Sequence, residues 1–309
     1  MKSNYWRGKK IVVTGGNGFL GKHLVKALIK LEPEKISVPD KSIFDLREYN
    51  SCLKAFKGSD IVIHLAGNVG GIGYNQDKPA ELFDDNLLMG VNSIRAARIL
   101  NVKKFVSLGT ICAYPKFTPI PFKERDLWNG YPEETNAPYG LAKKMLLVQS
   151  QAYRQQYNFN SIFLLPVNLY GPGDNFDDKS SHVIPALIKK FVKAKRENIL
   201  QVVIWGSGKP TREFLYVEDA VSGILLASEK YDKPDPVNLG SGFEISIKDL
   251  AKIIASLIQY KGKIIFDKTK PDGQPKRRLD VSKAKKEFGF VAKTNFKEGL
   301  KKTILSYSG

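Results

Sequence analysis

Tyr139 and Lys143 stand four residues apart in the segment Tyr-Gly-Leu-Ala-Lys, directly after Pro138. Proline is favoured in the first turn of a helix, and a spacing of four places both side chains on one helical face. A tyrosine has an ordinary pKa of about 10, which a neighbouring ammonium lowers by stabilising the phenolate. Such a pair can pass a proton to or from a carbonyl oxygen while a hydride moves. We expect Thr110, at the end of a strand, to hydrogen-bond the same oxygen.

A glycine-rich loop follows the short apolar run at residues 9–13. The loop has the spacing Gly-x-x-Gly-x-x-Gly and contains Gly15, Gly18, Phe19, Leu20 and Gly21. One glycine forms the turn, the next lets backbone N–H groups approach a diphosphate, and the third lets the following helix pack closely. The diphosphate then lies at the positive N-terminal end of that helix. The loop therefore predicts a bound dinucleotide.

Cys112 and His182 form a second couple of groups that can move protons. A thiol with an ordinary pKa of about 8.5 and an imidazole with one of about 6.5 suit a base and an acid. Inverting a carbon centre needs one group on each face, and a single tyrosine cannot be on both. Taken alone, each residue also has an explanation without catalysis. An isolated cysteine is most often a small core residue, and an isolated histidine is most often a surface residue or one whose hydrogen bonds are satisfied.

Strand and helix patterns alternate up to about residue 200. Apolar runs predict strands at 9–13, 35–38, 60–66, 103–109 and 161–165, and amphipathic patterns predict helices over Leu24 to Leu31, at 81–99 and at 139–157. Continuous apolar runs are typical of strands buried on both faces of a parallel sheet. The pattern predicts an α/β fold, a Rossmann-type doubly wound parallel sheet with a smaller mixed α/β C-terminal substrate domain. We expect residues 1–166 with about 214–243 in the first domain, and about 167–213 with 244–309 in the second.

Composition limits the class of protein. The chain has 309 residues, of which 42% are apolar and 26% charged, as in an ordinary globular protein. Its two cysteines cannot form a disulfide framework, and no apolar run reaches the length of about 20 residues that spans a membrane. The N-terminus has no signal-peptide pattern. We therefore expect a cytoplasmic protein with no membrane partner.

The formal net charge of +18 comes mainly from lysine, with 39 Lys against 10 Arg. Lysine is a flexible, strongly hydrated cation, whereas arginine binds phosphates and bases in two-point contacts. The lysines are scattered, and the chain contains no zinc-finger or RNP motif. We expect no nucleic-acid partner. The charge indicates either a solvated surface or a field that attracts an anionic small substrate.

Several motifs together resemble the extended short-chain dehydrogenase/reductase family. They are the glycine loop, the strand Asp60-x-x-x-His64-Leu-Ala66 and the Tyr-x-x-x-Lys pair. Longer segments resemble one branch of that family, the GDP-4-keto-6-deoxy-D-mannose 3,5-epimerase-4-reductases. These segments are Gly109-Thr-Ile-Cys-Ala-Tyr-Pro115, Glu134-Thr-Asn-Ala-Pro-Tyr-Gly140, Val167-Asn-Leu-Tyr-Gly-Pro172, Ser181-His-Val-Ile-Pro-Ala186 and Trp205-Gly-x-Gly-x-Pro-Thr-Arg-Glu-Phe-Leu215.

The resemblance implies two reactions in one pocket, with GDP-L-fucose as the product. Cys112 matches the base that removes a proton from C3 or C5, and His182 matches the acid that returns one from the opposite face. Reduction at C4 then uses a hydride from the nicotinamide and a proton from Tyr139, with Lys143 and Thr110 assisting. The family more often has serine where this chain has Thr110, and the hydroxyl is kept.

The resemblance also implies the binding residues. For the cofactor they are Gly15, Gly18, Phe19, Leu20, Gly21, Asp40, Lys41, His64, Ala66, Tyr139, Lys143 and Pro166. For the GDP-sugar substrate they are Asn168, Lys190, Trp205 and Arg212, and no metal is implied.

The identity of the cofactor depends on the segment after the second strand. The family usually uses NADP(H) and often has a basic residue there, whereas this chain has Asp40. A carboxylate favours the free ribose of NAD(H), although Lys41 and Ser42 are placed to hold a phosphate. We expect NADP(H), and the sequence leaves NAD(H) open.

The sequence also leads to expectations about the oligomeric state and about alternative functions. The resemblance implies a homodimer that pairs through the helix carrying Tyr139 and Lys143. The alternative function is that of a reductase or epimerase of a different nucleotide-activated keto-sugar. A cofactor-binding sensor without catalysis is a third interpretation, which the retained Tyr–Lys pair disfavours.

Overall fold

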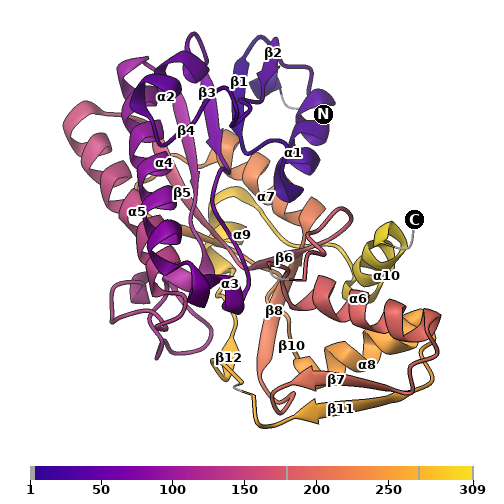
Figure 1. Ribbon diagram of the computed structural model, residues 1–309. Helices are drawn as coiled ribbons and strands as arrows, with labels where there is room; N and C mark the ends of the chain where they lie inside the picture. The colour runs from indigo at the N-terminus through magenta and orange to yellow at the C-terminus, as the bar shows by residue number, and fades with distance from the viewer. Residues whose placement is uncertain (1–3, 179, 271, 308–309) are drawn as a thin grey trace.

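The apolar runs of the sequence form a six-stranded sheet in a computed structural model, which describes residues 4–178, 180–270 and 272–307 (Figure 1). The ends of the expected domains, residues 1–3 and 308–309, lie outside the described residues. The strands are β1 (Lys10–Thr14), β2 (Lys35–Ser37), β3 (Ile61–His64), β4 (Lys104–Leu108), β5 (Ser161–Pro166) and β9 (Val237–Leu239). All five pairings between them are parallel.

The strand order across this sheet is β2-β1-β3-β4-β5-β9. The chain proceeds from β1 to one side and from β3 to the other, so the order reverses between β1 and β3. Ligands of doubly wound sheets bind at such a reversal, beyond the carboxyl ends of the strands. The predicted Rossmann-type sheet is therefore confirmed, and its topology marks the end at which a cofactor site belongs.

Helices cover both faces of the sheet (Figure 1). On one face lie α2 (Tyr49–Phe56), α4 (Pro79–Ile99) and α5 (Ala137–Tyr157), and on the other α1 (Phe19–Ile29) and α7 (Val217–Lys230). The helical spacing of Leu24 and Leu28 buries both side chains beneath α1. A short helix, α3 (Ile72–Asp77), precedes α4, and 3-10 turns occur at Asn4–Trp6, Ile111–Ala113 and Glu124–Asp126.

The smaller part of the fold has two sheets and three helices. A four-stranded sheet contains β6 (Asn168–Tyr170), β8 (Thr211–Tyr216), β10 (Glu244–Ser246) and β12 (Lys276–Arg277), and a two-stranded sheet contains β7 (Gln201–Trp205) and β11 (Lys263–Asp267). Its helices are α6 (Val183–Arg196), α8 (Ile247–Ile258) and α10 (Phe296–Tyr307). Fully buried Phe191, Ile254 and Leu300 share one hydrophobic core between them.

One late segment packs with the large sheet. Leu279, Phe288 and Phe290 belong to the core of that sheet, and α9 (Ser282–Phe288) lies against α7 and β9. The expected boundaries assign this segment to the second domain. We propose instead that residues 279–290 belong with the first. Among the described residues, no helix is both long enough and apolar enough to cross a membrane.

Gly21 is where the glycine loop and α1 come closest together. A methyl carbon added at Gly21 would lie 2.1 Å from the carbonyl oxygen of Gly15 and 2.5 Å from the Cα of Gly16. Both neighbours are backbone atoms, which cannot rotate away as a side-chain tip would. The third glycine of the loop therefore sets the approach of α1 to the sheet.

Gly21→Ala should lower the free energy of unfolding by about 1–3 kcal/mol, because the overpacked helix must move away from the loop. Urea denaturation measures this loss. The matched control is Gly73→Ala in α3, where an added carbon meets no atom within 4 Å. An equal effect of both substitutions would contradict the importance of the close approach.

Candidate active site

The 3-10 turn after β4 packs directly on the first turn of α5. Thr110 begins this turn, and its hydroxyl accepts a hydrogen bond from the backbone N–H of Cys112 at 3.2 Å. Gly140 faces the turn so closely that an added Cβ would lie 2.4 Å from the carbonyl oxygen of Cys112. This contact brings together three of the predicted catalytic residues, Thr110, Cys112 and Tyr139.

Burial controls the ionisation of Tyr139. It raises the pKa of the phenol above its ordinary value, the charge of Cys112 raises it further, and a hydrogen bond from Thr110 lowers it. The sequence predicts that the ammonium of Lys143 lowers this pKa, whereas in the structure the effect of burial is larger and the net shift is upward. Desolvation of the phenolate outweighs the favourable interactions, so Tyr139 is a protonated phenol at neutral pH.

Lys143 lies one turn further along α5, buried beneath the loop that follows β3. Its Nζ donates a hydrogen bond to the carbonyl oxygen of Ala66 at 3.1 Å, and its side chain is only 3% exposed. Burial lowers the pKa of Lys143 to about 8, because the ammonium loses hydration. The lysine therefore changes charge close to neutral pH, at the edge where β1 and β3 end.

His64 lies inside the sheet layer, although the resemblance implies a contact with the cofactor. Its side chain is fully buried, it stacks on Phe105, and its Nδ1 lies 2.9 Å from the Thr14 hydroxyl. Burial, with a smaller contribution from Lys143, lowers the pKa of His64 to about 3, so the ring is neutral. The imidazole fixes Thr14, whose hydroxyl also accepts the N–H of Ala66 at 3.2 Å. The His64 side chain thus stabilises the candidate site from inside the sheet layer, through Thr14.

The glycine loop has the geometry of a diphosphate cradle. Gly15 has a φ of +68°, and an added Cβ would lie 2.9 Å from the backbone nitrogen of Ala66. The N–H of Gly18 closes the turn on the carbonyl of Gly15 at 3.0 Å. Phe19 and Leu20 begin α1 and are partly exposed beside it. The N-terminus of α1 and the open glycine backbone fit a dinucleotide diphosphate. Pro166, also partly exposed, ends β5.

The carboxylate of Asp40 accepts hydrogen bonds within its own turn. One carboxylate oxygen accepts the backbone N–H of Ser42 at 2.8 Å and its hydroxyl at 2.6 Å. These hydrogen bonds, chiefly the one from the hydroxyl, lower the pKa of Asp40. The carboxylate thus has a structural partner, and the adjacent Lys41 is exposed.

Cys112 has two polar neighbours that sequence reasoning missed. Its Sγ lies 3.7 Å from Oδ1 of Asn136, to which the thiol donates, and 3.7 Å from Nη1 of Arg277, from which it accepts. Arg277 belongs to the run Lys276-Arg277-Arg278, whose three charges predict a surface position. In the structure, however, Arg277 is only 9% exposed. Asn136 lies three residues before Tyr139 in the segment 134–140. Its position next to a predicted catalytic residue is the signal in the sequence that marks it as a hydrogen-bond partner.

Arg212 lies in the same group of residues. Its Nη1 donates to the carbonyl oxygens of Thr211 and Gln274, both at 2.7 Å. Burial lowers the pKa of Arg212 to about 10, and the charge of Arg277 lowers it further, whereas the charge of Cys112 opposes the shift. The guanidinium remains charged at neutral pH.

The other predicted residues are positioned by the smaller part of the fold. His182 precedes α6 and makes no side-chain hydrogen bond within the described chain, and the surrounding protein lowers its pKa by desolvation. Its neighbour Ser181 reaches the loop after β3, since a Cβ at Gly71 would lie 2.8 Å from the Ser181 carbonyl oxygen. Asn168 donates its amide to the carbonyl of Glu213 at 3.0 Å.

Lys190 and Trp205 lie together at α6 and β7. Nζ of Lys190 donates to the Val203 carbonyl at 3.2 Å, and partial burial lowers its pKa. Trp205 is 68% exposed, with the ammonium of Lys270 lying 5.5 Å from its ring centroid. Among the interactions of the described residues, none joins this pair to Cys112 or Tyr139.

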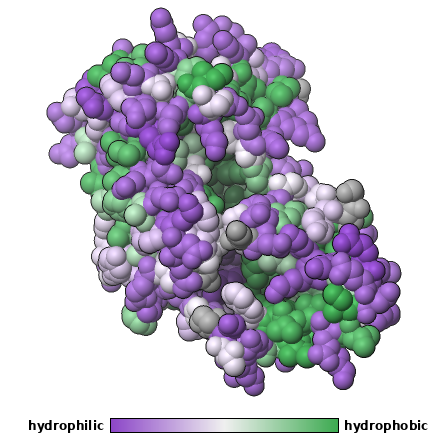
Figure 2. Space-filling model, viewed as in Figure 1, coloured by the Kyte–Doolittle hydropathy of each residue, from purple (hydrophilic) through white to green (hydrophobic). Residues whose placement is uncertain are grey.

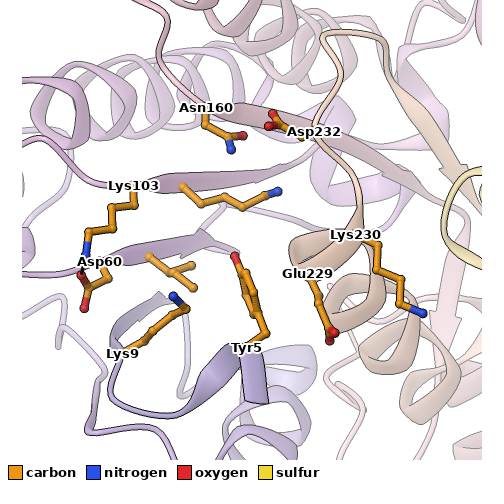
Figure 3. Close-up of a pocket in the computed structure, with 10 residues that line it drawn as sticks. Tyr5, Lys9, Asp60, Lys103, Asn160, Glu229, Lys230 and Asp232 are labelled. Carbon is orange, nitrogen blue, oxygen red and sulfur yellow. Dashed lines mark ion pairs between the residues drawn. The ribbon is translucent and has the colours of Figure 1, made fainter. Parts of the chain in front are cut away.

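A recess separates the part of the molecule that carries the large sheet from the part that carries β7 and β11, and hydrophobic residues lie within it (Figure 2). A different cavity of about 320 Å³ lies at the amino-terminal ends of β3 and β4. Lys103 and Asp60 form an ion pair of 2.8 Å there (Figure 3). This cavity contains none of the predicted site residues and lies at the end of the sheet opposite to the glycine loop.

Comparison with known proteins agrees with this geometry. The model of the NAD dependent epimerase/dehydratase family matches residues 11–240. A GDP-L-fucose synthase of Sinorhizobium fredii is 40% identical over 302 residues, covering 97% of this chain and 96% of that protein. The solved GDP-L-fucose synthetase of Naegleria fowleri, bound to NADP, superposes with a TM-score of 0.89 and 29% identity, covering 98% of this chain and 94% of that one.

A GDP-6-OMe-4-keto-L-xylo-heptose reductase of C. jejuni superposes with a TM-score of 0.92 and 27% identity, covering 97% of this chain and 98% of that one. The resemblance drawn from the motifs is thereby confirmed. With most of its length matched by the family model and a relative of 40% identity over nearly the whole chain, this protein belongs to the NAD-dependent epimerase/dehydratase family of enzymes.

Proposed function

We propose that this protein converts GDP-4-keto-6-deoxy-D-mannose to GDP-L-fucose, by epimerisation at C3 and C5 and reduction at C4. The observation that carries the proposal is the cluster of Thr110, Cys112 and Tyr139 where the turn after β4 meets α5. It places a thiol beside a phenol, which a reductase alone does not require. The names of the curated relatives agree with this activity.

Epimerisation uses the acidity of the protons next to the C4 ketone. The Cys112 thiolate takes a proton from C3 or C5, and the electron pair moves to the C4 oxygen. Thr110 and Tyr139 hold that oxygen by hydrogen bonds, which stabilises the developing negative charge. His182, after taking up a proton from solvent, then gives that proton to the carbon from the opposite face as the C4 ketone re-forms, and the centre is inverted.

Reduction uses the same two hydroxyls. Bound NADPH supplies the hydride for C4. Tyr139 donates a proton to the C4 oxygen, and its protonated state in the structure suits that role. The ammonium of Lys143 stabilises the phenolate that remains. Arg212 and Lys190 are cations of the kind that bind a nucleotide diphosphate.

NADP(H) is the cofactor that we propose. The glycine cradle fits a dinucleotide, and the carboxylate of Asp40 is engaged by Ser42 while Lys41 is exposed to meet a ribose phosphate. The bound NADP of the Naegleria fowleri structure supports the same choice. We also propose a homodimer through α4 and α5, which expose Leu88, Ile99 and Val148.

An alternative substrate is a different GDP-activated 4-keto-sugar. The similarity to a GDP-heptose reductase favours this alternative, because that structure superposes as well as the fucose synthetase does. The two proposals differ at C3 and C5, where only epimerisation exchanges protons with solvent. Incubation with GDP-4-keto-6-deoxy-D-mannose and NADPH, followed by NMR of the product, tests which one holds.

Cys112→Ser should nearly abolish the exchange of solvent deuterium into C3 and C5, because a hydroxyl is a far weaker base than a thiolate. Hydride transfer to an already epimerised ketone should survive. Mass spectrometry of the sugar in deuterated water measures the exchange. Cys52→Ser is the matched control, since Cys52 is fully buried away from the cluster. Unchanged exchange in Cys112→Ser would contradict the role of the thiol.

The rate of reduction should fall as the pH rises through about 8, because Lys143 then loses the proton that stabilises the phenolate of Tyr139. The rate falls and does not rise because a lysine is charged below its pKa and neutral above it, and burial brings that pKa down to about 8. Steady-state oxidation of NADPH gives the profile. Lys143→Met should be slower and flat across this range. A wild-type rate that stays constant to about pH 9.5 would exclude this role.

Lys41→Ala should raise the KM for NADPH about tenfold and leave the KM for NADH unchanged, because one charge-assisted hydrogen bond to phosphate is lost. Lys30→Ala, at another exposed lysine, is the control and should change neither constant. A preference of the wild-type enzyme for NADH would instead assign the ribose contact to Asp40.

A further inference from the structure

Arg277 reaches the reacting sulfur from the smaller part of the fold. It lies on β12, which pairs in parallel with β8 so that Arg277 stands opposite Arg212. Partners opposite one another in a sheet point to the same face. Both guanidiniums therefore leave the sheet together, and Nη1 of Arg277 approaches Sγ of Cys112 at 3.7 Å.

The position of Arg277 is fixed by contacts on both sides. Its Nε donates to the side-chain oxygen of Gln274, and the amide of Gln274 donates to the carbonyl of Lys116 at 2.7 Å. Lys116 follows the turn that carries Cys112. Just beyond β12, the N–H of Phe122 donates to the carbonyl of Arg278 at 2.8 Å. The end of β12 and the segment 116–122, which follows the cysteine turn, are thus joined at two points.

The charges around the sulfur favour a negative group there. Arg277 on β12 and Arg212 on β8 lie close enough for their charges to oppose each other, and among the groups that offset this repulsion at Arg212 the largest effect is that of Cys112. The charge of Cys112 also acts on Tyr139 of α5, and Glu133 and Asp272 have smaller effects on Arg212. Two buried cations of this kind stabilise a thiolate.

The partners of Cys112 differ for its two protonation states. A thiolate accepts the hydrogen bond of Arg277, and a thiol donates to Oδ1 of Asn136, which also accepts from Asn75 at 3.3 Å. Each state thus has one partner already in place.

We propose that Arg277 is a positioning residue that holds Cys112 as a thiolate and directs its sulfur towards the substrate. This inference rests on the proposed epimerisation. In that step the C–H bond at C3 or C5 breaks, an S–H bond forms, and the electron pair of the C–H bond moves to the C4 oxygen. The new S–H donates to Asn136, and its proton later leaves to water.

The test compares Arg277→Met with Lys276→Met. Lys276 is the exposed neighbour on the same strand, so its substitution removes an equal charge without touching the sulfur. Arg277→Met should slow deuterium exchange at C3 and C5 by about 10- to 100-fold at pH 7, since one hydrogen bond to a charged group is lost. Lys276→Met should leave the exchange unchanged. Arg277→Lys, which keeps the charge, should restore part of the rate.

Alkylation of Cys112 by iodoacetamide is the second measurement, because only the thiolate reacts. In Arg277→Met its dependence on pH should move to higher pH, and Arg277→Lys, which restores the charge, should move it back, whereas a merely structural loss would not follow the charge at this position. Peptide mass spectrometry separates Cys112 from the buried Cys52. Arg277→Gln, which keeps a polar side chain, replaces the methionine variant if that variant does not fold.

The outcomes separate the two proposals. Exchange and alkylation at wild-type rates in the Arg277 variants would overturn the role of Arg277 while leaving the epimerisation in place. A wild-type enzyme that exchanges no deuterium would overturn the proposed epimerisation. In that case a shifted alkylation profile would still support the pairing of Arg277 with the thiolate, and an unshifted one would exclude it.

Discussion

The catalytic arrangement depends on the contact between the 3-10 turn after β4 and the first turn of α5. Only a hydrogen fits at Gly140, because a Cβ there would lie 2.4 Å from the carbonyl oxygen of Cys112. The turn therefore rests on the helix that carries Tyr139, and Thr110 is held between them. A parallel sheet already directs β4 to this edge. The close contact converts that approximate position into a cluster of side chains within hydrogen-bond reach.

Burial then determines the charge of each group in the cluster. It keeps Tyr139 protonated, brings the pKa of Lys143 to about 8 and keeps His64 neutral. Arg212 and Arg277, both buried cations, stand opposite each other on neighbouring strands. Such a site is costly until an anion enters, because buried like charges repel. A nucleotide diphosphate and a thiolate are the two anions that the proposed reaction brings there, and the net charge of +18 favours the approach of the first.

The parts of the molecule that the sequence predicts well are those encoded locally. Strand, glycine loop and helix follow one another within residues 10–29, and the spacing of Tyr139 and Lys143 already specifies a helical face. Arg277 could not be found in this way, since it meets Cys112 across 165 residues and only because β12 pairs with β8. His64 is the opposite case, a residue for which a local motif predicts a cofactor contact. Its motif places it beside the cofactor loop, but β3 is buried on both faces, and the ring stacks on Phe105 and contacts the Thr14 hydroxyl within the sheet layer.

The two proposed reactions differ in how much of the fold they require. Tyr139, Lys143 and the glycine loop, which provide the proposed proton transfer and the cofactor site of the reduction, all belong to the large sheet and its helices. The epimerisation that we propose also uses Cys112 from that part, together with Arg277 and His182 from segments that follow β6. The contacts of Gln274 with Lys116 and of Ser181 near Gly71 hold those segments in place. A related enzyme with substitutions at His182 and Arg277 alone would therefore keep the residues proposed for the reduction and lose those proposed for the epimerisation.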